Sequence, residues 1–210
     1  MPNRTPAKAW QEMVRGNERF VRGEPLHPRQ DVERREELSE GQAPHAALFG
    51  CSDSRLSAEI IFDTGLGDLF VIRNAGQVVS ESVLGSLEYA VGVLNVPLIV
   101  VLGHDSCGAV QAAIDAVKPG AAALPPHIAS LVDKIVPAVR RVSVTSNGSP
   151  DPIDVGREHL RDTIAEILAG SELISDAIAA GTLGIVGANY RLLEGTAVPD
   201  VHVGNLEGPH

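Results

Sequence analysis

The chain has 210 residues and a formal charge of −10. This length suits one compact domain with a sizeable core, and we predict a single domain over residues 1–210, divided into an N-terminal helical arm (1–40) and a core (41–210). The excess of acidic side chains repels phosphate backbones and anionic lipid headgroups. Nucleic acid and membranes are therefore not expected partners.

The amino-terminal residues lack the continuous apolar stretch of a secretory signal, and the most apolar segment, "VPLIVVLG", is too short to span a bilayer. These features predict a cytoplasmic protein. Since the cytosol is reducing, the two cysteines of the chain do not indicate a disulfide. A metal site or a catalytic thiol is the more informative interpretation.

The first predicted element is an amphipathic helix over residues 6–22, where Trp10, Met13 and Phe20 recur near helical spacing. A polar, charged stretch that contains prolines follows over residues 23–45. We therefore expect this helix to be detached from the main body and to lie on a neighbouring subunit.

Three short runs that are apolar almost throughout follow at residues 45–50, 69–73 and 97–104. Such runs are typical of strands covered on both faces in a parallel sheet. Helical patterns occupy residues 82–94 and 107–118. The alternation of strands and helices predicts an α/β fold with right-handed crossovers.

Beyond residue 118 the pattern is mainly helical until one last strand. We predict a helix interrupted by Pro137, a long helical region over residues 154–180, and a buried strand over 183–190 that turns back as a short hairpin. The predicted fold class is thus α/β, with a mostly parallel central sheet flanked by helices, an N-terminal helical arm and a short C-terminal strand or hairpin.

Both cysteines follow predicted strands. Cys51 comes after the first strand, and His104 with Cys107 comes after the third. Loops at the carboxyl ends of neighbouring parallel strands converge, so these three side chains could reach one ion. Two thiolates and one imidazole suit Zn²⁺, and a three-ligand set leaves the fourth position open to a water, as in catalytic zinc sites.

Asp53 and Arg55 follow Cys51 in the same loop. We expect them to form a pair beside the metal, in which the carboxylate accepts a hydrogen bond from zinc-bound hydroxide and the guanidinium holds the carboxylate. In the alternative arrangement, Asp53 is itself the fourth zinc ligand. That closed state would displace the water and give a pH-dependent gate.

The motifs "CSDSR" and "GHDSCGA", together with "GDLFVIRNAG", "SLEYAV" and "GIVGANYRLLEG", closely resemble the β-class carbonic anhydrases over nearly the whole chain. The resemblance implies one Zn²⁺ per chain on Cys51, His104 and Cys107, with Asp53 and Arg55 as the catalytic dyad. It implies reversible hydration of carbon dioxide to bicarbonate and a proton through zinc-bound hydroxide.

The resemblance also assigns residues to the substrate pocket. Gln42 corresponds to a glutamine that reaches into the partner's pocket across a dimer interface, which implies a homodimer or a dimer of dimers. The remaining pocket positions implied by the family are Phe70, Ala75, Tyr89 and Gly108. A bacterial subgroup with a non-catalytic bicarbonate site has tryptophan where this chain has Leu48, although it shares Arg73, so the chain resembles the branch without that tryptophan.

Two other functions are compatible with the residues. One is hydrolysis of carbonyl sulfide or carbon disulfide on the same scaffold. The other is non-catalytic: a zinc- or bicarbonate-binding module, or a thiol redox module that uses Cys51 and Cys107. The remaining histidines show no ligand spacing and are predicted to be surface or structural residues: His27, His45, His127, His159, His202 and His210.

Overall fold

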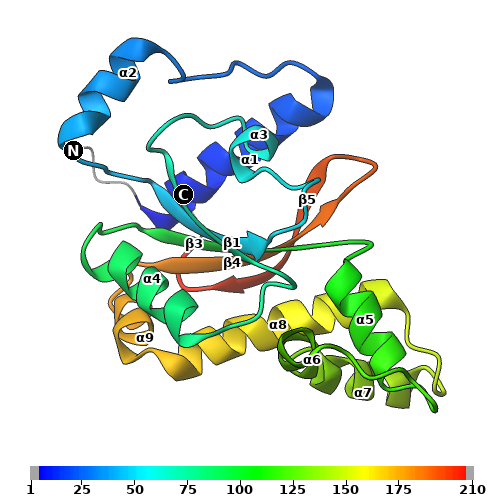
Figure 1. The fold of residues 1–210 in the computed structure, drawn as a ribbon. Coiled ribbons are helices and arrows are strands. Elements are labelled where there is room, and N and C mark those ends of the chain that lie inside the picture. Colours follow the sequence, from blue (N-terminus) through cyan, green and yellow to red (C-terminus); the bar gives the residue numbers. More distant parts are fainter. Residues whose placement is uncertain (1–4, 207–210) are drawn as a thin grey trace.

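The computed structural model describes residues 5–206 of the chain. Its centre is a five-stranded sheet with the strand order β2-β1-β3-β4-β5 (Figure 1). The first four strands in chain order run parallel, and β5 is antiparallel to β4. The strands are β1 Ala46–Cys51, β2 Leu69–Asn74, β3 Leu98–His104, β4 Gly184–Arg191 and β5 Thr196–Val203.

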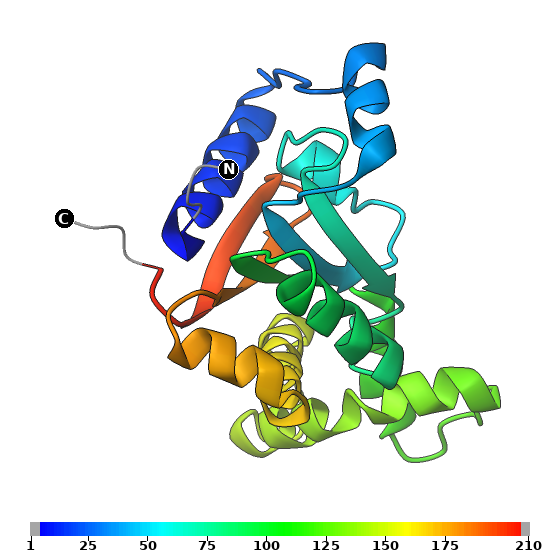
Figure 2. The ribbon, with the colours of Figure 1, turned by 90° about the vertical axis from the view of Figure 1, so that its left-hand side faces the viewer.

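Helices cover both faces of this sheet (Figures 1 and 2). One face carries α1 and α3, and the other carries α4, α8 and α9. The helices are α1 Pro6–Arg22, α2 Val32–Glu37, η1 Leu38–Glu40, α3 Ala58–Ile61, α4 Glu81–Gly92, α5 Gly108–Ala116, α6 Pro126–Asp133, α7 Val136–Thr145, α8 Pro152–Gly170 and α9 Glu172–Ala179. The predicted α/β fold with its C-terminal hairpin strand is confirmed.

Alternation of side chains along the strands builds the two halves of the core. Leu48 of β1 packs in the apolar cluster that contains Met13 of α1, whereas its neighbour Phe49 packs in the cluster that contains Leu87 of α4. Both strand residues are almost completely buried. The uninterrupted apolar run of β1 therefore reflects burial on both faces, as predicted.

The expectation that the N-terminal helix is detached from the main body is wrong. Trp10 and Met13 are buried against the chain's own sheet. The Asn17 side chain donates to the carbonyl of Ile61 at 3.1 Å and accepts from the N–H of Ala197 at 2.9 Å. The polar stretch after α1 only loops back over the surface, so it does not separate the helix from the core. The division of the chain at residue 40 stays a prediction.

One further expectation is refined by the structure, and another needs correction. The region 154–180 is divided into two helices, because Ser171 adopts an extended conformation. Its hydroxyl accepts from the N–H of Ile174 and thereby caps the first turn of α9. Strand β2 is half-buried rather than covered on both faces, since it lies at the edge of the sheet. The break at Pro137 is confirmed, with that residue in the first turn of α7.

Candidate metal centre

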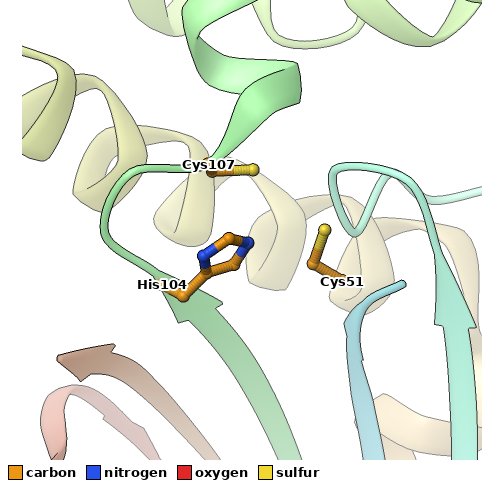
Figure 3. Close-up of side chains that lie close together, drawn as sticks. All are labelled: Cys51, His104 and Cys107. Carbon is orange, nitrogen blue, oxygen red and sulfur yellow. The ribbon is translucent and has the colours of Figure 1, made fainter. Parts of the chain in front are cut away.

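Three potential metal ligands meet at the carboxyl edge of the sheet (Figure 3). Cys51 is the last residue of β1, His104 is the last residue of β3, and Cys107 is the N-cap of α5. Because β1 pairs directly with β3, the loops that follow them lie side by side. The two sulfurs and an imidazole nitrogen lie within 4.8 Å of one another, and all three residues are buried. The predicted convergence of these side chains is confirmed.

The Cys51 end of the site is held by the loop after β2. The N–H of Gly76 donates to the Cys51 sulfur at 3.4 Å. Arg73, the penultimate residue of β2, donates from Nε to the carbonyl of Cys51 at 2.9 Å and from Nη2 to the carbonyl of Asp53 at 2.7 Å. The guanidinium of Arg73 thus fixes the backbone that carries both the ligand and the acid.

The imidazole of His104 is oriented by its backbone neighbour. Its Nδ1 lies 2.8 Å from the carbonyl oxygen of Asp105, so this nitrogen carries the proton and donates. The other nitrogen, Nε2, is buried, and no hydrogen-bond partner is found for it within residues 5–206. A buried lone pair with this tautomer is what a metal-binding histidine requires.

The sulfurs influence each other's ionisation. The hydrogen bond from Cys107, assisted by His104, lowers the pKa of Cys51. The same hydrogen bond to Cys51, together with burial, raises the pKa of Cys107. Burial lowers the pKa of His104, but the nearby Cys51 outweighs it and the net pKa is raised. One thiolate is therefore favoured in the metal-free site, and a bound dication would supply the charge that favours the second.

This donor set fits zinc. Two thiolates and one imidazole from the same chain, with the histidine's second nitrogen bonded to a carbonyl, make a Cys₂His set that leaves one tetrahedral position open. Neither cysteine is in a disulfide. Gly108, next to Cys107, is exposed and has nothing within 4 Å of where a Cβ would stand, so this side of the site is open to solvent.

Asp53 and Arg55 form a two-pronged ion pair at the mouth of the site. Arg55 donates from Nε to Oδ1 at 2.9 Å and from Nη2 to Oδ2 at 2.7 Å, and its backbone N–H donates to Oδ1 at 3.0 Å. A further bond from Nη2 reaches the carbonyl of Ser106 at 3.1 Å and links the two loops. Arg55 holds the pKa of the Asp53 carboxyl well below its usual range, so this acid is ionised at neutral pH.

The remaining predicted site residues fall into two groups. Ala75 and Gly108 are exposed neighbours of Gly76 and Cys107 and therefore border the metal site. Phe70 and Tyr89 contact each other, with ring centroids 6.0 Å apart. Phe70 pairs with Ala47, four residues or about 13 Å along the sheet from the level of Cys51. The structure does not bring this aromatic pair to the chain's own metal site.

Gln42 also lies away from this metal site. It is exposed in the loop that precedes β1, whereas Cys51 ends that strand, about 17 Å further along. A role for Gln42 at a metal site would therefore need the site of another chain, which agrees with the cross-subunit role implied by the resemblance. That role stays a prediction.

Two residues beside the metal site were given no part in it by the sequence. Gly76 supplies the hydrogen bond to Cys51, and its sequence signal was its place at the end of the motif "GDLFVIRNAG", just after an apolar strand. His159, predicted to be surface or structural, lies buried behind Gly76. No spacing links residue 159 to the metal motifs, so only the packing of α8 against the sheet reveals it. His210 lies outside the described residues.

Comparisons with known proteins identify the family of the chain. The family model described as "Carbonic anhydrase" matches residues 46–197. Carbonic anhydrase 2 of Mycobacterium tuberculosis is 50% identical over 207 residues, and a carbonic anhydrase of Mycolicibacterium smegmatis is 45% identical over 206; each alignment covers 98% of both chains. A tetrameric β-carbonic anhydrase of Sordaria macrospora superposes with a TM-score of 0.72 at 25% identity, covering 80% of this chain and 87% of that one.

The chain therefore belongs to the carbonic anhydrase family, and its fold is that of the β-class. The recognition of this family from the sequence motifs is confirmed. Within residues 5–206, no helix combines the length and the apolar character needed to cross a bilayer.

Proposed function

We propose that the protein catalyses the reversible hydration of carbon dioxide to bicarbonate and a proton, with one Zn²⁺ per chain held by Cys51, His104 and Cys107. The observation that carries this proposal is the buried Cys₂His set beside an ionised aspartate. Structural zinc sites fill all four positions with protein atoms, and the three-donor set found here is the arrangement of a catalytic site. Membership of the carbonic anhydrase family supports the substrate.

When bound, zinc acts as a Lewis acid that lowers the pKa of a coordinated water towards neutrality. The residues of the chain then orient the reacting groups. Asp53 would accept a hydrogen bond from that water, and its ion pair with Arg55, which binds both of its oxygens, supports this role by keeping the carboxylate ionised. Arg55 is in turn anchored on the carbonyl of Ser106, in the loop between two of the ligands.

A closed state with Asp53 as the fourth zinc ligand is a second part of the proposal. The structure has this carboxylate on Arg55, outside the group of three ligands. Closure would break the bonds from the Arg55 side chain. Because Arg55 keeps Asp53 ionised, its protonation would not trigger closure near neutral pH. A structure of the zinc-loaded protein at low pH would test closure, and a water retained on zinc in an inactive enzyme would rule it out.

We further propose that the working unit is a homodimer or a dimer of dimers, in which Gln42, Phe70 and Tyr89 of one chain complete the pocket that Ala75 borders in the other. The support is the exposure of Gln42 and Tyr89, at 45% for the tyrosine, and the distance of Phe70 from the chain's own site. A monomer at micromolar concentration by light scattering would contradict this assembly.

Two unpaired thiols suit a cytoplasmic location.

Stopped-flow measurement of carbon dioxide hydration by the zinc-loaded protein tests the proposed function. We expect proton release well above the uncatalysed rate, and about one zinc per chain by metal analysis. A zinc-loaded protein that is inactive at every pH would refute the enzymatic proposal. Turnover of carbonyl sulfide or carbon disulfide with no carbon dioxide hydration would reassign the substrate. A folded, zinc-free protein that cycles between thiols and a Cys51–Cys107 disulfide would indicate a redox module instead.

A further inference from the structure

A buried histidine lies directly behind the metal centre. His159, on the inward face of α8, is only 4% exposed, and its Nε2 lies 2.8 Å from the carbonyl oxygen of Gly76. Its other nitrogen, Nδ1, is buried, and no hydrogen-bond partner is found for it in the described part of the chain. The proposed reaction assigns no role to this residue.

The hydrogen bond fixes the tautomer of His159. A carbonyl oxygen only accepts, so Nε2 must carry the proton and donate, and Nδ1 keeps its lone pair. Burial lowers the pKa of the imidazole, which is therefore neutral at physiological pH. His159 thus acts as a single directed donor to the backbone.

The acceptor of this bond belongs to the residue that contacts a metal ligand. Gly76 donates its own N–H to the Cys51 sulfur at 3.4 Å. Its φ of 80° is in the left-handed region, and a Cβ there would lie 2.8 Å from that of Ala109. Only glycine fits this position, and because glycine has the most backbone freedom, the loop needs external restraints.

Those restraints come from both ends of the loop. The side chain of Asn74 accepts from the N–H of Val78 at 2.9 Å and donates to its carbonyl at 2.7 Å, which closes the turn. From α8, the hydroxyl of Thr163 donates to the carbonyl of His159 at 2.9 Å, and the carbonyl oxygen of Gln77 lies 3.4 Å from the same hydroxyl, a longer contact. Among the described residues, His159 supplies the side-chain hydrogen bond to the carbonyl of Gly76 itself, so it is the most direct restraint on the residue whose N–H faces Cys51.

We propose that His159 is a positioning residue of the metal centre, which holds Gly76 so that its N–H donates to the Cys51 sulfur. This inference rests on the proposed function, because it takes zinc to be the metal. The hydrogen bond from the Gly76 N–H draws negative charge away from the Cys51 sulfur and fixes the orientation of that sulfur. It thereby strengthens metal binding through geometry and keeps the metal a stronger Lewis acid. His159 itself touches neither metal nor substrate.

The test compares His159→Leu, which removes the donor, with His159→Gln, whose amide nitrogen can occupy the place of Nε2. Ile167→Val is the matched control, because Ile167 is a buried residue of the same helix in the cluster on the α4 side of the sheet. For each folded variant, zinc affinity is measured by chelator competition. The thiolate-to-metal charge-transfer band is recorded after cobalt substitution, and unfolding of the metal-free protein is followed separately.

We expect His159→Leu to weaken zinc binding about tenfold or more, which is the usual effect of removing a partner of a metal ligand, and to shift the cobalt–thiolate band. His159→Gln should restore both properties towards wild type, and Ile167→Val should leave both unchanged. If the leucine variant does not fold, His159→Met takes its place as a flexible residue without a donor.

Equal zinc affinity and an unshifted band in a folded donor-less variant would overturn the inference. A glutamine variant as impaired as the leucine variant would do the same. These failures are distinct from failure of the proposed function, which would show in the wild type as no stoichiometric zinc or no carbon dioxide hydration. A wild type that binds zinc and turns over, with a His159→Leu variant that matches it, would refute the positioning role alone.

Discussion

The two ends of strand β1 differ in whether a single chain supplies all the residues of the proposed site. At the carboxyl end, the three metal ligands are buried and converge, with hydrogen bonds from Gly76 and to the carbonyl of Asp105. At the amino end and along the β2 edge, Gln42 and Tyr89 are exposed and face no metal site of their own chain. All three candidate metal ligands therefore come from a single chain, whereas the proposed substrate pocket needs a second one.

The largest expected effect comes from removing a metal ligand. Cys51→Ala should abolish stoichiometric zinc and reduce carbon dioxide hydration to the uncatalysed rate, because two donors cannot hold zinc in a stable tetrahedral site. Metal analysis and stopped-flow assays measure both effects. Ser52→Ala, at the exposed neighbouring position, should retain zinc and activity. A Cys51→Ala protein with full zinc content would show that the metal lies elsewhere.

Next in size is the loss of the acid beside the metal. Asp53→Asn should keep zinc but lower kcat/KM by about 100-fold. The neutral amide is a weaker hydrogen-bond acceptor than the ionised carboxylate and cannot take up a proton. Asp115→Asn serves as control, since this aspartate is an exposed acid of α5 that pairs with Lys118. Unchanged kcat/KM in zinc-loaded Asp53→Asn would remove Asp53 from the mechanism.

Gln42→Ala should lower kcat/KM by about tenfold, the effect of one lost hydrogen bond to substrate, with zinc content unchanged. Complementation tests whether Gln42 acts on the partner. In a mixed dimer of Gln42→Ala and Asp53→Asn chains, one site has an intact Asp53 and receives an intact Gln42 from the other chain. Activity of the mixture should therefore exceed the mean of the two variants. An activity equal to that mean would place Gln42 in its own chain's site, or in none.

The smallest effect concerns stability on the α1 side of the sheet. Burial raises the pKa of Asp63, but the N–H groups of Leu26 and His27 and the guanidinium of Arg19 outweigh it, so the net pKa is lowered. A depressed carboxylate stabilises the fold above its unfolded pKa of about 4, and this contribution is lost as the pH falls through its folded value.

Asp63→Asn should accordingly lower the free energy of unfolding by about 2 kcal/mol at pH 7, with the difference from wild type shrinking below about pH 4. Urea unfolding at several pH values measures this difference, and zinc binding should not change. A difference that is constant from pH 7 to pH 3 would contradict the ionic origin of the effect.

The strands and the clustering of Cys51, His104 and Cys107 could be predicted because their signals are local. Uninterrupted apolar runs mark β1 and β3, which are buried on both faces, and the short spacing of His104 and Cys107 places both at one strand end. Once the two parallel strands are neighbours, the loops that follow them must lie side by side, so the three side chains have few other places to be. Asp53 and Arg55 were predictable for the same reason, since both lie in the Cys51 loop.

What the sequence could not give depends on packing between distant segments. The position of α1 on its own sheet follows from Trp10 and Met13 meeting residues far along the chain, and the polar stretch after α1 hides that contact. The role of His159 depends on a contact between residues 76 and 159, which no periodicity encodes. From the sequence, Arg73 was noted only because a bacterial subgroup with a bicarbonate site shares it. Its hydrogen bonds show that it holds the backbone carbonyls of Cys51 and Asp53.

The most direct test of the metal centre is zinc X-ray absorption spectroscopy on the purified protein at neutral pH. The arrangement of Cys51, His104 and Cys107 predicts two sulfur neighbours at about 2.3 Å and two nitrogen or oxygen neighbours at about 2.0–2.1 Å. The nitrogen of His104 accounts for one of the lighter neighbours. A water oxygen in the position that the protein leaves open accounts for the other. A zinc shell with one sulfur or none, or one with four sulfurs, would contradict the central claim.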